Sequence, residues 1–183
     1  MRSAGWVLAV AALPAGAAEL ITVEFDRLED RYVFESEALF EVGVEPLYGV
    51  FLDYDLSPRF SGAIVEARNL PPGPDGLPGF YVLNRGCVLF FCKSFERYGV
   101  VESEPYTTIR ARVDPGRSDF EFSNETWEFR PAGDDTIVHY RVEFEPSFWV
   151  PPVLGPWMIR RTLASRGSEA IQRIEAIARE QAQ

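Results

Sequence analysis

The chain has 183 residues and a formal net charge of −10, with 28 acidic residues against 18 lysine and arginine residues. This length is sufficient for one domain with a substantial hydrophobic core. Because nucleic-acid binding requires a basic face that neutralises phosphates, the acidic balance and the lack of a basic run argue against a nucleic-acid partner.

The first residues have the pattern of a secretory signal peptide. Arg2 supplies the positive charge, residues 6–13 form a short apolar core, and Ala15-Gly16-Ala17 has the small residues of a cleavage site. The apolar core is too short to cross a bilayer of about 30 Å. We therefore expect a signal peptide over 1–18, a mature domain over 19–183, and a periplasmic or secreted location. A buried N-terminal helix is the alternative.

The first half of the mature chain alternates between strand and helix patterns. Residues 24–30 form a polar lead-in, and residues 32–42 then place aromatic and small side chains in one phase and mostly glutamates in the other. This alternation predicts a half-buried strand whose glutamates face solvent. Residues 45–53 have the spacing of a short amphipathic helix, and 56–60 that of a second helical turn with Pro58 in its first turn.

The second half consists mainly of strand patterns. A strand is predicted over 63–70, followed by the proline- and glycine-rich hairpin connection 71–79. Further strand patterns cover residues 80–88, 93–104, 107–114, 119–130 and 136–145. The aromatic phase changes within 119–130, and a bulge near Asn124 would account for that change. Successive strands joined by short turns predict an antiparallel meander.

A long amphipathic helical pattern ends the chain, with apolar residues at helical spacing from Leu163 to Ala178. A helix over 157–180 would be roughly 36 Å long, enough to cross a whole sheet. Many inward residues of the strands are small, at Ser36, Ala38, Gly99 and Ala111. Small residues beneath a long helix predict a cavity there, and a fully packed α+β core is the alternative.

Cys87 and Cys92 are the two cysteines of the chain. In an oxidising compartment they would form a disulfide that closes a small loop, and two buried apolar thiols are the other reading. With one histidine, His139, they are too few for a zinc site. His139 is in the phase that faces away from the cavity, and no phosphate loop or nucleophile elbow appears. The sequence therefore predicts neither a metal nor a cofactor.

Two segments carry a resemblance to a known family. Val50-Phe51-Leu52-Asp53-Tyr54, followed by Pro58-Arg59-Phe60, is similar to the DYxxxPxF segment of START-like (SRPBCC) proteins. Trp127 and the terminal amphipathic helix match the same superfamily, in particular its polyketide cyclase/dehydrase and coenzyme-Q-binding branch. The segments GCVLFFCKSFE and FEPSFWVPPVLGPWMIRR resemble a secreted bacterial subgroup.

The resemblance implies an α+β helix-grip fold. In this fold a curved antiparallel sheet wraps around a long C-terminal helix, two short helices follow the first strand, and a hydrophobic ligand tunnel lies between sheet and helix. By strand and helix phase, the residues expected to line this cavity are Tyr32, Phe34, Phe40, Ile109, Trp127, Phe129, Tyr140, Phe144, Ile171 and Ile174. Aromatic walls with polar tips suit a ligand with a long apolar body and one polar head.

The proline-stiffened apolar segment before the helix is a candidate lip of the tunnel. Two tryptophans beside a basic pair suit transient contact with a membrane interface. The predicted lip residues are Phe90, Phe91, Trp149, Val153, Leu154 and Trp157. The alternative is a rigid connection that packs beneath the helix.

We therefore predict a periplasmic or secreted carrier for a hydrophobic small molecule, such as a lipid or an isoprenoid- or quinone-like compound, rather than an enzyme. A cyclase- or dehydratase-like lyase acting in the same cavity is the alternative, with Tyr32, Ser36 and Tyr140 as its candidate polar residues. A protein-interaction module of the cell envelope is a further alternative.

Overall fold

The structure is a computed structural model that describes the backbone of residues 17–88, 91–150 and 154–183, and the side chains of 17–86, 92–150 and 167–183. In chain order its elements are β1 (Glu19–Leu28), β2 (Arg31–Phe40), α1 (Val44–Leu52), the 3₁₀ helix η1 (Tyr54–Arg59), β3 (Ile64–Leu70), β4 (Gly79–Val88), β5 (Phe91–Glu104), β6 (Thr108–Val113), β7 (Phe120–Ala132), β8 (Asp135–Pro146) and α2 (Leu154–Gln181).

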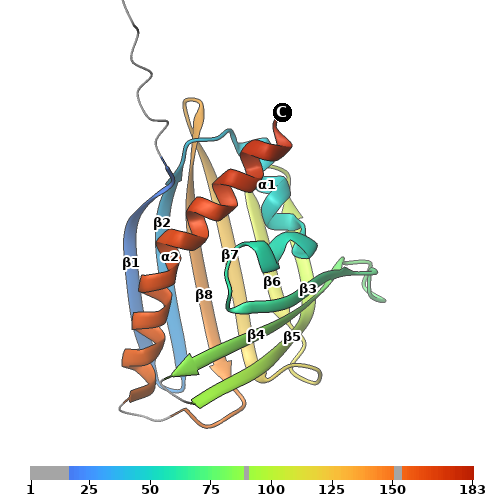
Figure 1. The fold of residues 1–183 in the computed structure, drawn as a ribbon. Helices are drawn as coiled ribbons and strands as arrows, with labels where there is room; N and C mark the ends of the chain where they lie inside the picture. The colour runs from blue at the N-terminus through green and yellow to red at the C-terminus, as the bar shows by residue number, and fades with distance from the viewer. Residues whose placement is uncertain (1–16, 89–90, 151–153) are drawn as a thin grey trace, which may run out of the picture.

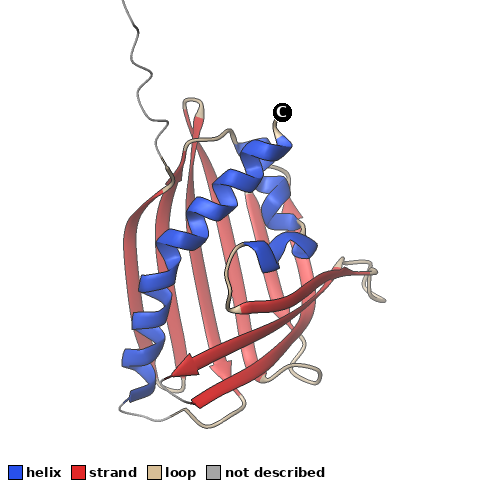
Figure 2. Cartoon of the chain, in the orientation of Figure 1, coloured by secondary structure: helices blue, strands red, loops and turns tan. Residues whose placement is uncertain are grey.

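All strands form one antiparallel sheet of eight strands in the order β1-β2-β8-β7-β6-β5-β4-β3. The meander β3 to β8 ends beside β2, so that β1 and β3 are the two edges. The sheet is curved, α2 runs diagonally across its concave face, and α1 and η1 cover one end of that face (Figure 1). Figure 2 shows that α1, η1 and α2 lie on this same side of the sheet. The predicted α+β helix-grip fold is confirmed.

Two local predictions were wrong. Residues 19–28 form the strand β1, whereas the sequence indicated only a polar lead-in from residue 24. As an edge strand β1 has mostly exposed or half-buried side chains, so its apolar alternation is weak. The bulge of β7 lies between Phe120 and Phe122 rather than near Asn124. It places Phe120 on the concave face and leaves the remainder of β7 in a single phase.

The C-terminal half of α2 packs on the core through one apolar stripe. Ile174, Ile177 and Ala178 are buried, and Ile171 is half-buried against the same cluster, which includes Leu47 of α1. This spacing is the helical periodicity visible in the sequence. The stripe packs this half of α2 against α1 and the core cluster.

Ion pairs add a polar anchor at this end of α2. The buried Glu175 carboxylate accepts a hydrogen bond from the backbone N–H of Glu41 at 2.7 Å. Arg179 lies 2.8 Å from Glu175 and 3.3 Å from Glu41. Arg59 of η1 lies 2.7 Å from Glu180. These contacts tie the end of α2 to β2 and η1.

The convex face of the sheet carries charged side chains. Arg31 lies 3.0 Å from Glu143 and 3.3 Å from Glu145. His139 lies 3.7 Å from Glu35 on the same face. The lone histidine therefore points away from α2, as the strand alternation predicted. Among the helices of the described chain, none combines the length and the apolar character needed to cross a bilayer.

Candidate ligand-binding site on the concave face

The concave face has a packed end beneath α1. Phe40, Ile109 and Phe129 are exposed by only 1%, 0% and 4%. The rings of Phe40 and Phe129 contact those of α1, with Phe51 5.5 Å and Tyr48 5.4 Å from Phe129 between ring centroids. Since they have almost no accessible surface, we assign these three predicted cavity residues to the core.

Toward the β1–β2 turn the same face is less tightly closed. Trp127, Tyr140 and Phe144 each keep part of their accessible surface, although they lie in the middle of the sheet. Tyr140 stacks on Trp127 at 5.2 Å and lies 6.0 Å from Phe34, and Tyr32 stacks on Phe144 at 5.4 Å. The structure thus brings these five predicted residues together as one aromatic wall, in which Tyr32 and Phe34 are buried and the other three are half-buried.

Most of the small inward residues make room for neighbouring side chains. A Cβ atom on Gly99 would lie 2.6 Å from the Phe80 ring, so that the glycine accommodates this phenylalanine. Ala38 and Ala111 are buried in the core cluster. Ser36 is half-buried, as Gly99 is, and lies directly opposite Tyr140 in the β2–β8 pairing. Small size alone was therefore a poor indicator of open space.

A buried ion pair lies on this face. Arg97 of β5 pairs with Glu125 of β7, and their side chains are 17% and 8% exposed. The strand neighbours of Glu125 are the buried Ala111 and Val142, so its carboxylate is directed toward the apolar interior. Burying two charges costs several kcal/mol per ion before pairing offsets it, about 20 in the idealised limit. The stability of the fold alone therefore gives no reason for a buried ion pair at this position.

Two phenols lie near the pair. Tyr54 of η1 is buried, and its ring stacks on Phe80 at 4.7 Å and 12°. Desolvation raises the pKa of Tyr54 well above its ordinary value, and the charge of Arg97 opposes this rise. Desolvation also raises the pKa of Tyr140, which interacts electrostatically with both Arg97 and Tyr54. Both phenols are thus neutral, protonated groups at physiological pH.

Two donors of this polar cluster, defined as Tyr54, Arg97, Glu125 and Tyr140, have no hydrogen-bond partner within the described part of the chain. They are the hydroxyl of Tyr54 and the Nε of Arg97, and both atoms are buried. A buried polar group without a partner costs about 1–3 kcal/mol. A ligand oxygen that accepts hydrogen bonds from them would remove this penalty.

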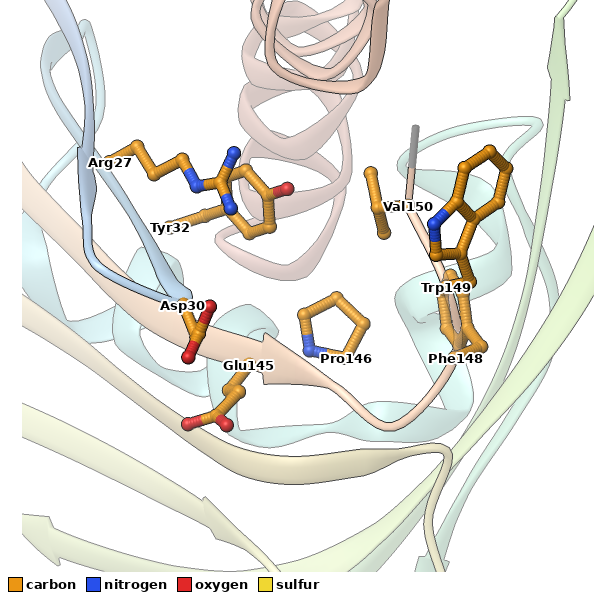
Figure 3. Close-up of a pocket in the computed structure, with 8 residues that line it drawn as sticks. All are labelled: Arg27, Asp30, Tyr32, Glu145, Pro146, Phe148, Trp149 and Val150. Carbon is orange, nitrogen blue, oxygen red and sulfur yellow. The ribbon is translucent and has the colours of Figure 1, made fainter. Parts of the chain in front are cut away.

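The described surface has a pocket at the β1–β2 turn, where the aromatic wall ends. The pocket has a volume of about 360 Å³ and is lined by Arg27, Asp30, Tyr32, Glu145, Pro146, Phe148, Trp149 and Val150. Figure 3 shows Tyr32 and Arg27 on one side and Trp149 and Phe148 on the other. The ring of Phe148 also contacts Phe95 of β5, at 6.1 Å. The start of β5 and the segment after β8 therefore meet at this end of the sheet.

Only part of the predicted lip can be placed. Trp149 is 79% exposed beside the pocket. Phe90 and Val153 lie outside the described residues, and so do the side chains of Phe91, Leu154 and Trp157. Their role as a lip stays a prediction.

The cysteines lie at the far end of the β4–β5 hairpin. Cys92 is disulfide-bonded. Cys87, the only other cysteine of the sequence, is its direct backbone partner across the two strands. Elsewhere in the described residues, no group of three or more histidine, cysteine, aspartate or glutamate side chains is placed to hold a metal ion.

The site residues predicted from the sequence did not include Arg97, Glu125 or Tyr54. Arg97 shares the strand phase of Gly99, and Glu125 shares that of Trp127, so both were assignable to the concave face by alternation. Opposite charges in the inward phase of two nearby strands were the available signal. Tyr54 was noted only through the family resemblance.

Comparisons with known proteins agree with this geometry. Residues 41–167, more than half of the chain, match the family described as "Polyketide cyclase / dehydrase and lipid transport". A comparison with curated protein sequences finds no significant match.

Solved structures with low sequence identity share the fold. A START superfamily protein from Mycobacterium smegmatis has a TM-score of 0.63 and 16% identity, over 79% of this chain and 98% of that one. The Zhui aromatase/cyclase from Streptomyces sp. R1128 has a TM-score of 0.63 and 9% identity, over 84% and 96%. A STAR-related lipid transfer protein from Xanthomonas axonopodis has a TM-score of 0.57 and 12% identity, over 88% and 99%. The match over residues 41–167 shows that the chain belongs to the polyketide cyclase/dehydrase and lipid transport family, and its fold is that of these solved structures.

Proposed function

We propose that this protein binds and carries a hydrophobic small molecule, a lipid or an isoprenoid- or quinone-like compound, between the concave face and α2. The polar cluster would hold a hydrogen-bond-accepting head group, and the aromatic wall would contact the apolar body. The observation that carries the proposal is the pair of buried donors on Tyr54 and Arg97 that have no hydrogen-bond partner among the described residues. Solved proteins with this fold include a STAR-related lipid transfer protein and an aromatase/cyclase.

The state of Tyr140 supports a ligand space on this face. Its side chain keeps partial accessibility, yet desolvation raises its pKa. Desolvation disfavours the charged form of a phenol, so Tyr140 lies in largely apolar surroundings while part of its surface stays accessible. Trp127, stacked on Tyr140, is half-buried in the same place.

A matched pair of ligands tests the proposal. Acetylnaphthalene and isopropylnaphthalene have the same ring system and similar size, but only the first has a carbonyl acceptor. We expect the purified protein to bind the acetyl compound more tightly by about tenfold or more, as a hydrogen bond to a charged donor allows. Tyr54→Phe and Arg97→Met should each reduce this preference. Equal affinity of the wild-type protein for both compounds, or no binding of either, would contradict the proposal.

The exposed Trp149 and the pocket beside it support transient membrane contact for ligand exchange. Tryptophan favours membrane interfaces, and 79% of its surface is available. On vesicles of phosphatidylcholine, fluorescence of the wild-type protein should shift to the blue, and Trp149→Ala should bind less. No difference between the two proteins would exclude Trp149 from such contact.

A periplasmic or secreted location is part of the same proposal. The signal-like N-terminus and the disulfide of Cys92 support it, because disulfides persist in oxidising compartments. Expression with the intact N-terminus in a bacterial host, followed by fractionation and mass measurement, tests it. Retention of the full-length chain in the cytoplasm would overturn this part.

A second candidate, a cyclase- or dehydratase-like reaction, is favoured by the two neutral phenols beside Arg97. A neutral phenol can donate a proton to a ligand carbonyl while the guanidinium stabilises the developing negative charge. A poly-β-ketone analogue incubated with the protein should then cyclise faster than in buffer. Unchanged turnover in Tyr54→Phe and Tyr140→Phe would remove the phenols from this role.

A further inference from the structure

We infer that Asn69, on the edge strand β3, is a positioning residue that holds the Tyr54 phenol in the polar cluster. The inference rests on the proposed function, because it assigns Asn69 a role in recognition of the ligand head group. Asn69 itself is exposed, and the structure gives its side chain hydrogen bonds to η1 and the residue before it but none to Arg97, Glu125 or Tyr140. It would act through the main chain of the segment Asp53-Tyr54-Asp55.

Asn69 binds this segment at several points. Its Oδ1 accepts a hydrogen bond from the Tyr54 N–H at 3.1 Å. Its Nδ2 donates to Asp53 at 2.7 Å and to Asp55 at 3.2 Å, and its backbone N–H donates to Asp55 at 3.1 Å. The amide thus uses its acceptor and its donors at once. Hydrogen bonds of a donor to carboxylates are among the stronger ones in proteins.

The same strand pair holds both parts of Tyr54. Asn69 faces Phe80 in the β3–β4 pairing, and the Phe80 ring stacks on the Tyr54 ring. The main chain of Tyr54 is therefore fixed by one residue of the pair, and its ring by the other. A shift of η1 along β3 would break the amide contacts and move the phenol relative to Arg97.

Hydrogen bonds add direction to the apolar packing of η1 on β3. Ala67 is the one residue of β3 that is buried, and it shares the core cluster with Tyr54, while the other β3 side chains are half-buried or exposed. The directional contacts of Asn69 therefore fix where η1 lies along β3. The carboxylates of Asp53 and Asp55 also exclude an acidic residue at position 69, because like charges at hydrogen-bond distance repel.

The test uses Asn69→Ala and Asn69→Ser in the full chain. Asn69→Ala should lose most of the preference for acetylnaphthalene over isopropylnaphthalene, about a tenfold change in the affinity ratio, with isopropylnaphthalene binding unchanged. Asn69→Ser keeps one acceptor for the Tyr54 N–H and should retain part of the preference. If Asn69→Ala fails to fold, Asn69→Ser alone provides the comparison. Asn124→Ala, at an exposed asparagine of β7, is the matched control and should keep the wild-type ratio.

A second readout distinguishes positioning from general destabilisation. Ultraviolet titration should show Tyr54 ionising at lower pH in the Asn69 variants, because a displaced phenol loses part of its desolvation. Subtraction of the Tyr54→Phe curve assigns this step. If wild-type protein shows the ligand preference and Tyr54→Phe abolishes it, while both Asn69 variants keep it, the inference is overturned and the proposed function stands. If the wild-type protein has no preference, the proposed function fails first.

Discussion

Removal of one partner from the Arg97–Glu125 pair should destabilise the fold far more than removal of both. Glu125→Leu leaves the guanidinium in the interior without a counter-charge, and Arg97→Met does the same to the carboxylate. The double variant replaces the pair with apolar side chains of similar volume. Since the two side chains are only 17% and 8% exposed, solvent can screen little of the remaining charge.

The expected magnitudes follow from this burial. Each single variant should lower the free energy of unfolding by about 3 kcal/mol or more, and the double variant should lie within about 1 kcal/mol of wild type. For a domain of this size, 3 kcal/mol corresponds to a decrease of roughly 6–12 °C in Tm. The coupling free energy of the double-mutant cycle, the sum of the two single losses minus the loss in the double variant, should therefore be about 5 kcal/mol or more.

Urea unfolding monitored by circular dichroism gives the free energies of all four proteins. Glu102 and Arg112 form the control pair, at 2.6 Å on neighbouring strands, with side chains 44% and 54% exposed. The cycle of Glu102→Leu and Arg112→Met should yield a coupling below about 1 kcal/mol. If the interior pair couples no more strongly than this exposed pair, the assignment of Arg97 and Glu125 to a water-excluded site is wrong.

Three further predictions test the burial of side chains on the concave face and at its rim. Tyr54 and Tyr140 should be the last tyrosines to ionise in an alkaline titration, and the free energy of unfolding should fall as pH rises above about 10, because the unfolded chain releases these two protons at lower pH than the folded chain does. The decrease of this free energy with pH should be smaller in the double variant Tyr54→Phe/Tyr140→Phe. An equal decrease in that variant would show that the two phenols are not desolvated. Gly99→Ala should lower the free energy of unfolding by at least about 2 kcal/mol, since its Cβ would lie 2.1 Å from a backbone oxygen. Gly62→Ala, with no atom within 4 Å, should be near neutral, and equal effects would contradict the packing. Trp149→Ala should change stability by less than about 0.5 kcal/mol, and a larger loss in thermal unfolding would place its ring in the core.

The architecture was predictable because most strands and the terminal helix have a strong apolar period. The aromatic phases of β2 and β8 and the stripe Ile171, Ile174, Ala178 needed no tertiary information. β1 was missed because an edge strand buries too few side chains to show alternation. The bulge of β7 was predicted at the wrong position because the sequence shows only that the inward phase of the aromatic residues changes along the strand. The pairing with β8 determines the residue at which that change occurs.

The candidate site was predictable only in its apolar part. Tyr32, Phe34, Trp127, Tyr140 and Phe144 share strand phases, so their common face followed from local alternation. The polar cluster brings together η1, β5, β7 and β8, and the distance between such elements depends on sheet order and curvature. Phe40, Ile109 and Phe129 were in the correct phase, but their burial under α1 depends on where that short helix packs.

The buried ion pair also bears on why the cluster exists. Apolar residues of similar volume would stabilise the interior at least as well as a buried salt bridge does, so stability alone gives no reason for Arg97 and Glu125. Glu125 offsets the charge of Arg97, and the Nε of Arg97 still has no partner among the described residues. A guanidinium that Glu125 holds in place, and whose Nε has no hydrogen-bond partner among the described residues, is suited to bind an acceptor atom of a ligand. The double variant Arg97→Met/Glu125→Leu should therefore fold with nearly wild-type stability and bind both naphthalenes equally. If it retains the preference for the acetyl compound, the head group is recognised elsewhere.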